Sequence, residues 1–123
     1  MSRALDDLSP TFRPFANLFL ARLMEARIPV MIDTTSRTQE EQIDAVKRGV
    51  SWTLKSKHLT GDAIDVCPYA QYDAHGPNKA LWDETDPIWL KIGAIGQACR
   101  LKWGVVNGTT GQRKDLGHFE LAI

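Results

Sequence analysis

The sequence has no long apolar segment and no excess of charge of either sign. None of its apolar runs approaches the roughly 20 residues that a transmembrane helix requires, so we expect no membrane-spanning segment. Lysine and arginine together number 15, as do aspartate and glutamate, so the formal net charge is zero. This balance gives no basis for long-range attraction to nucleic acid or to an anionic membrane. A partner must therefore be recognised by a local site.

Cysteine is also scarce, with only Cys67 and Cys99 and no Cys-x-x-Cys pair. Two separated cysteines fit a reducing compartment and exclude a disulfide-stapled fold. We interpret both as small buried apolar residues, although Cys67 could instead line the site described below, because it follows Asp65 on the same strand face. Residues 1–7 lack the apolar stretch of a signal peptide, so we expect synthesis in the cytoplasm.

At 123 residues the chain has the length of one domain, and we find no repeat, low-complexity run or linker in it. We expect residues 1–123 to form a single α+β domain, with three helices packed on a small, mostly antiparallel sheet. The predicted helices cover residues 10–27, 38–47 and 86–102. The predicted strands cover residues 30–32, 63–66, 103–106 and 117–121.

Local signals mark the start of each predicted helix. Ser9 followed by Pro10 is a typical beginning, Thr38 and Glu41 form a capping box, and Asp86 precedes a proline. Apolar residues at three- and four-residue spacing predict the buried face of the first helix: Phe12, Phe15, Leu18, Phe19, Leu23 and Met24.

The segment 56–65 contains groups that could bind a metal. Its residues 63–66 alternate as in a strand, which holds the carboxylate of Asp65 on a rigid element. Gly61 accepts the positive φ of a sharp turn, which would bring His58 back towards Asp65. A metal site on these two side chains requires that turn.

A second segment, 115–121, repeats this combination near the end of the chain. If it ends in a strand, His118 and Glu120 share one face while the apolar residues between and after them face the core. Asp115 lies three residues before His118, in a turn at the entrance of that strand. Its carboxylate could stand beside a metal without binding it, where a general base is needed.

Together the two segments supply two imidazoles and one carboxylate, the protein ligands of a catalytic zinc ion with one open position. The residues alone leave other interpretations open. A histidine beside apolar residues is often a packed or surface residue, and aspartate beside glycine is ordinary turn chemistry.

The order of short motifs along the chain adds a resemblance. It resembles the D-alanyl-D-alanine metallopeptidase group, and it is most similar to the phage L-alanyl-D-glutamate endopeptidases, which are endolysins. The fold then expected is that of hedgehog and D-alanyl-D-alanine peptidases. The motifs are Ser56-x-His58-x-x-Gly61-x-Ala63-x-Asp65, Trp103-Gly104 and Asp115-x-x-His118-Phe119-Glu120-Leu121.

The resemblance implies a role for each matching residue. It implies His58, Asp65 and His118 as the ligands of one zinc ion per chain, and Asp115 as the catalytic carboxylate. It also implies that Arg37 stabilises the scissile carbonyl oxygen as that atom becomes negatively charged.

Four further residues are candidates for supporting roles. Ser56 and Glu120 could orient the zinc ligands. Tyr72 and Trp82 could contact substrate, because they lie in the long irregular segment 68–85, which we expect to form a wall of the substrate groove.

The implied function is hydrolysis of the L-alanyl-D-glutamate bond in peptidoglycan stem peptides during host cell lysis. The implied protein is a monomer that is made in the host cytoplasm, reaches the wall with help from a holin and carries no separate wall-binding module. Two departures from the family pattern lie beside the expected cleft: Gly117 replaces a common proline, and residues 105–107 replace a second glycine and a tryptophan.

Three alternatives remain at this point. The same zinc site could belong to a D-alanyl-D-alanine carboxypeptidase or dipeptidase. It could also belong to a non-catalytic, hedgehog-like zinc-binding module, against which the presence of both Asp115 and Arg37 argues. The third alternative is a structural domain without metal.

Overall fold

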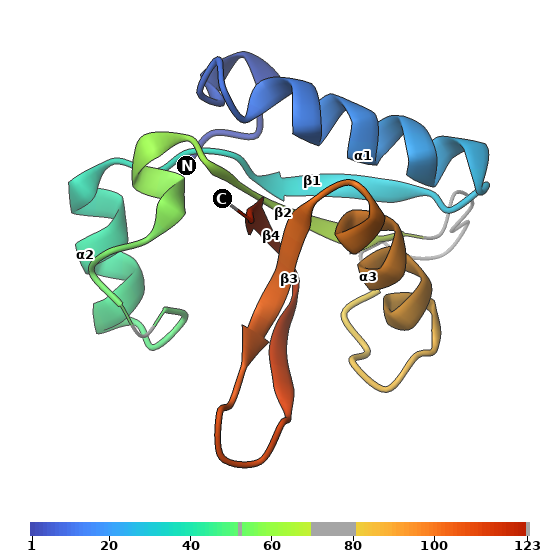
Figure 1. Ribbon diagram of the computed structural model, residues 1–123. Helices are drawn as coiled ribbons and strands as arrows, with labels where there is room; N and C mark the ends of the chain where they lie inside the picture. Colours follow the sequence, from blue (N-terminus) through green and yellow to red (C-terminus); the bar gives the residue numbers. More distant parts are fainter. Residues whose placement is uncertain (52, 70–80, 123) are drawn as a thin grey trace, which may run out of the picture.

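The computed structural model describes residues 1–51, 53–69 and 81–122 and has an α+β architecture (Figure 1). Its helices are α1 (Arg13–Glu25), α2 (Gln39–Lys47) and α3 (Ile88–Ala98). The four strands are β1 (Val30–Thr34), β2 (Ala63–Pro68), β3 (Leu101–Val106) and β4 (Arg113–Leu121). They form one antiparallel sheet in the order β1-β2-β4-β3. In the described part of the chain, no helix has the length and apolarity needed to span a membrane.

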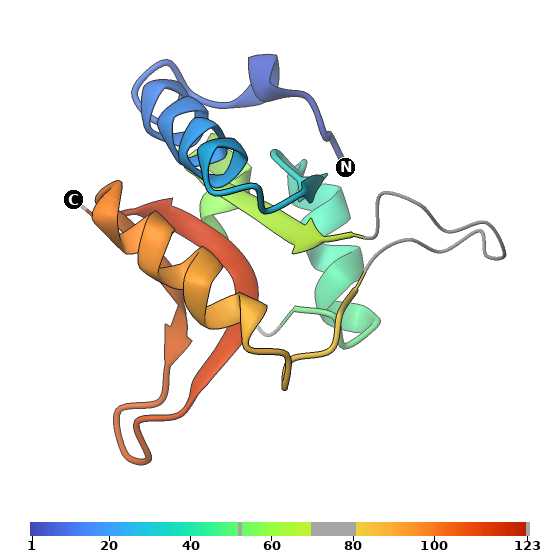
Figure 2. The same cartoon turned by 90° about the vertical axis from the view of Figure 1, so that its right-hand side faces the viewer.

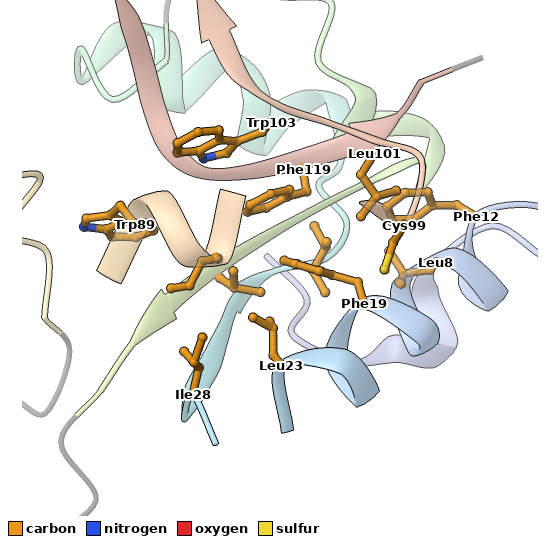
Figure 3. Close-up of a cluster of buried hydrophobic side chains, with 14 residues drawn as sticks. Leu8, Phe12, Phe19, Leu23, Ile28, Trp89, Cys99, Leu101, Trp103 and Phe119 are labelled. Carbon is orange, nitrogen blue, oxygen red and sulfur yellow. The ribbon is translucent and has the colours of Figure 1, made fainter. Parts of the chain in front are cut away.

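The hydrophobic core lies between the sheet and helices α1 and α3. These two helices pack beside each other, and α2 lies apart from them, beyond β2 (Figures 1 and 2). Phe19 of α1 and Phe119 of β4 meet at the centre of the core, with ring centroids 4.5 Å apart (Figure 3). The opposite side of the sheet near α2 is thereby left free for polar groups.

Helices α1 and α3 are shorter than predicted. Helix α1 begins at Arg13 rather than residue 10, because Ser9 caps the preceding turn by accepting a hydrogen bond from the Phe12 amide. Helix α3 ends at Ala98 because Arg100 adopts a left-handed conformation with φ of 67°.

The apolar stripe of α1 is also narrower than its spacing suggested. Phe12, Phe19 and Leu23 are fully buried, as predicted, but Leu18 is 42% exposed and Met24 77% exposed. The buried face of the helix packs on α3 and on the core residues of the sheet, and a narrow face is enough to fill that contact.

Helix α2 begins as predicted. The Thr38 hydroxyl accepts from the Glu41 amide at 3.1 Å, and the Glu41 carboxylate accepts from the Thr38 amide at 2.9 Å. This capping box fixes the chain at the residue that follows Arg37.

The two glycines of α3 allow a close approach, but aromatic rings rather than a backbone approach them. A Cβ atom on Gly93 would lie 2.3 Å from the Trp103 ring, and one on Gly96 would lie 2.3 Å from the Phe119 ring. Helix α3 therefore sits directly on the aromatic side chains of β3 and β4. The sequence analysis also missed Trp89, which α3 buries almost completely.

Strand β4 is longer than predicted and carries an irregularity. It pairs with β3 from Arg113 onward, so residues 113 and 114 belong to the strand and residues 107–112 form the hairpin loop. Trp103 pairs with Phe119 and Val105 pairs with Lys114, so the four residues 115–118 of β4 stand opposite the single residue Gly104 of β3. Such bulges redirect side chains.

Candidate metal centre

Asp65 and His118 face each other on neighbouring strands. They are register partners in the β2–β4 pairing, and His118 Nδ1 lies 2.9 Å from Asp65 Oδ1. Both side chains are largely buried. Residues 53 positions apart therefore form one cluster because two strands pair in this register.

His58 reaches the same carboxylate from a short 3₁₀ turn at Lys57–Thr60. The Ser56 hydroxyl accepts from the His58 amide at 3.2 Å, and Gly61 ends the turn with φ of 74°, as the sequence predicted. His58 Nδ1 lies 3.0 Å from the Thr35 carbonyl oxygen. A carbonyl can only accept, so Nδ1 carries the proton, and Nε2 of a neutral ring has a free lone pair.

The lone pair of His58 points to where a cation would sit. Nε2 is buried 3.0 Å from Asp65 Oδ1, yet it makes no hydrogen bond with any described residue. One nitrogen or oxygen atom from each of His58, Asp65 and His118 lies within 4.8 Å of the others. Two imidazoles and one carboxylate match the donors of a catalytic zinc site, so these residues fit a metal ion.

Glu120 holds the second imidazole in position. His118 Nε2 donates to Glu120 Oε1 at 3.1 Å, which leaves Nδ1 directed at Asp65. A carboxylate that accepts from the outer nitrogen of a metal-binding histidine fixes its tautomer and ring orientation. Glu120 therefore makes the contact that a ligand-orienting residue would make, and its supporting role stays a prediction.

The charges within the cluster stabilise one another. Burial alone would raise the pKa of Asp65, but the hydrogen bond from His118 and the proximity of the His58 imidazole outweigh it and hold that pKa well below its usual range. Burial alone would lower the pKa of His118, but hydrogen bonds to Asp65 and Glu120 raise it to about 10. The carboxylate is thus ionised, as a metal ligand must be.

A cleft with a volume of about 220 Å³ opens over this cluster, on the side of the sheet away from the core. Seven of the predicted site residues line it: Arg37, Ser56, His58, Asp65, Asp115, His118 and Glu120. The sequence analysis missed five others: Val50, Ser51, Thr53, Lys55 and Lys57. Val105 also lines the cleft and is one of the residues expected beside it. Lys55 directly precedes the first motif and Lys57 lies inside it, between Ser56 and His58, which was a usable signal.

Asp115 lies on the β4 bulge at the cleft mouth, not in a turn before the strand. Its φ of 56° places it in the left-handed region, where the bulge turns its side chain towards the cleft. The residue remains solvent-exposed. Partial shielding of its carboxylate from water raises its pKa, and the nearby negative charge of Asp65 raises it further.

Arg37 is anchored to the turn that carries His58 and to helix α2. Its amide donates to the His58 carbonyl at 3.1 Å, and its guanidinium donates to Gln42 Oε1 at 3.2 Å. Gln42 is fully buried and donates to Ser51 Oγ and to the Thr53 carbonyl. Gln42 was missed, although a polar residue on the inner face of the helix was visible in the sequence.

Two of the sequence-based suggestions, Trp82 and Cys67, find no place in the cleft, and a third cannot be placed. Trp82 stacks on Trp89 with centroids 6.1 Å apart and is not among the lining residues, so its contact with substrate stays a prediction. Tyr72 lies outside the described residues. Cys67 is fully buried, its thiol donating to the Pro68 carbonyl, and it does not line the cleft.

Comparisons with known proteins agree with this arrangement. A family model described as phage L-alanyl-D-glutamate peptidase matches residues 2–121. The fold is similar to the crystal structure of the Serratia marcescens L-Ala D-Glu endopeptidase ChiX, with a TM-score of 0.68 and 23% sequence identity. The alignment covers 95% of this chain and 82% of that one. No curated protein sequence matches the chain.

Proposed function

The chain belongs to the phage L-alanyl-D-glutamate peptidase family, and on this basis we propose that it cuts peptidoglycan with a zinc ion held by His58, Asp65 and His118. The family acts on the L-alanyl-D-glutamate bond, so peptidoglycan is the substrate and the reaction is hydrolysis of a peptide bond. The metal, its ligands and the residue roles below are our proposal.

One observation carries the metal site. His58 Nε2 is buried beside an ionised carboxylate without a hydrogen bond from any described residue, which costs free energy unless a cation accepts its lone pair. The outer nitrogens of both histidines are occupied by Thr35 and Glu120, so the inner nitrogens, His58 Nε2 and His118 Nδ1, are both directed at Asp65.

A bound zinc ion would supply Lewis acidity and lower the pKa of a water molecule from roughly 16 to about 7. Asp115 takes the proton from the attacking water and delivers it to the leaving amine of D-glutamate. Its raised pKa suits this task, because a carboxylate that holds protons more tightly is the stronger base.

Arg37 binds the carbonyl oxygen of the scissile bond as negative charge develops on it. Its guanidinium is held by Gln42 at the wall of the cleft, so little rearrangement is needed when the substrate binds. Ser56 keeps the His58 turn closed through the His58 amide.

Metal analysis tests the proposed site. We expect purified protein to hold about one zinc ion per chain, and His58→Ala or His118→Ala to lose it, because the remaining donors are too few for tight binding. Wild-type protein that binds no zinc after zinc is added would refute the site.

Digestion of purified peptidoglycan tests the reaction. Mass spectrometry should find stem peptides that begin at D-glutamate; a carboxypeptidase would instead release only terminal D-alanine. Asp115→Asn should retain zinc and fold but lose hydrolysis by on the order of a thousandfold. Unchanged hydrolysis would remove Asp115 from its role.

We also propose that residues 1–123 act as a single monomeric catalytic domain in host lysis and need a holin-type pore to reach the wall. Cells that express the protein should lyse only when a pore-forming protein is expressed with it. Lysis by the protein alone would contradict the dependence on a pore, and gel filtration reports the oligomeric state.

A further inference from the structure

Two cationic side chains in the cleft have no assigned partner. Of the carboxylates that line it, Asp65 and Glu120 accept from the imidazoles. Arg37 donates to Gln42. Lys55 and Lys57 line the same cleft, and within the described ranges neither forms an ion pair.

Lys57 is the first residue of the turn that carries His58, and hydrogen bonds within the turn hold its backbone in place. Its carbonyl accepts from the Asp62 amide at 3.0 Å and from the Thr60 hydroxyl at 3.1 Å, and the next residue is His58. The side chain of Lys57 is exposed and lines the same cleft as Glu120. The pKa of Glu120 is lowered chiefly by its hydrogen bond with His118, and the positive charge of Lys57 contributes to that lowering.

The substrate of the family carries an anion near this position. D-glutamate supplies the leaving amine, and its α-carboxyl group is attached to the carbon atom that bears the scissile nitrogen. When the scissile bond lies over the metal cluster, that carboxyl group must lie within the same cleft. In peptidoglycan the group is either a free carboxylate or an amide.

We propose that Lys57, supported by Lys55, binds the free α-carboxylate of D-glutamate and makes the enzyme selective for stem peptides that are not amidated there. This inference rests on the proposed function of the site. An ammonium group that donates to a carboxylate gains charge-assisted hydrogen bonds, whereas an amide offers no net charge. Three carboxylates already line the cleft, so an uncompensated substrate carboxylate would otherwise be repelled.

Lys102 provides a matched control. It is the register partner of Glu120 on β3, and its charge also lowers the pKa of Glu120. It does not line the cleft. Lys57→Gln and Lys102→Gln therefore remove similar charges near Glu120, but only the first removes a cation that substrate can reach.

The test compares two synthetic muropeptides that differ only in D-glutamate against D-isoglutamine. Zinc-loaded wild type should cut the D-glutamate peptide with about tenfold higher kcat/KM. Lys57→Gln should raise KM for that peptide about tenfold, leave the amidated peptide unchanged and so remove the preference. Lys57→Arg should restore most of the preference for the D-glutamate peptide, and Lys102→Gln should retain that preference.

Calorimetry with the two released products gives a readout that does not need turnover. Wild-type protein should bind the D-glutamyl product more tightly than the D-isoglutaminyl one, and Lys57→Gln should bind them equally. Equal cleavage and binding of both forms by wild type would overturn the inference while leaving the peptidase intact. Equal losses on both substrates in Lys57→Gln would also overturn it, because they would indicate a structural role. Failure to cut either peptide would refute the proposed function itself.

Discussion

The candidate metal centre consists of two regions that are held by different kinds of structure. Asp65 and His118 lie opposite each other on paired strands, supported below by the core that contains Phe119. His58 lies on a short 3₁₀ turn outside the sheet. The strand pair is positioned by a regular ladder of backbone hydrogen bonds, whereas the turn is positioned by a few individual contacts.

The contacts of the turn come from distant parts of the chain. The Ser9 amide donates to the Gly61 carbonyl at 2.9 Å, and the Ser9 hydroxyl donates to Asp62 at 2.5 Å. The Thr35 carbonyl accepts from His58. The comparison indicates that the strand pair forms with the fold, while the position of His58 depends on these separate contacts and, in the proposed zinc-bound form, on the metal. Four predictions test this difference.

Removal of zinc should have the largest effect. Chelation should abolish hydrolysis, a loss on the order of a thousandfold, and added zinc should restore it. Because the turn has few other contacts, amide exchange at Leu59 and Gly61 should accelerate at least about tenfold, while exchange at Ile64 and Phe119 should barely change. Hydrogen-exchange mass spectrometry measures both. Equal acceleration in the strands would show that the two regions form one unit.

Glu120→Gln should weaken zinc binding through the strand pair that carries Asp65 and His118. The loss of the charged acceptor loosens the orientation of His118, so zinc affinity should fall about tenfold with little change in the free energy of unfolding of the metal-free protein. Competition with a chromophoric chelator measures the affinity. Glu40→Gln, on the exposed face of α2, is the control and should bind zinc like wild type.

Gly61→Ala should weaken zinc binding through the turn that carries His58. A Cβ atom there would lie 2.8 Å from the Ser9 amide nitrogen and 3.0 Å from the Asp7 carbonyl oxygen. Gly111 has a similar φ of 72° but nothing within 4 Å of a Cβ, so Gly111→Ala isolates the backbone strain of about 1 kcal/mol. Denaturant unfolding and zinc titration should show a larger loss of stability and severalfold weaker zinc binding for Gly61→Ala alone.

Ser9→Ala should have the smallest effect. It removes the hydrogen bond that the Ser9 hydroxyl donates to the Asp62 carboxylate and the one that it accepts from the Phe12 amide, each worth about 1 kcal/mol. Zinc affinity should fall about threefold, because the turn keeps its other contacts. Thr11→Ala, at an exposed neighbouring position, should be neutral in the same titration. A larger effect of Ser9→Ala than of Gly61→Ala would reverse the order of the two contacts.

The sequence by itself determined features that depend on a few adjacent residues. The capping box at Thr38, the sharp turn at Gly61 and the two faces of β4, with His118 in the cleft and Phe119 in the core, are confirmed in the structure. Each is set by local hydrogen bonds or by alternation along one strand. The family was also readable, because the order of its motifs does not depend on their spatial arrangement.

The tertiary structure decided what depends on pairing between distant segments. The β3–β4 register places Asp115 on a bulge, where the sequence predicted a turn. The packing of α1 leaves Met24 exposed. The same long-range contacts placed Lys57 in the cleft and Trp82 outside it. These outcomes arise from the register of strands and the packing of helices, which a local pattern of residues does not specify.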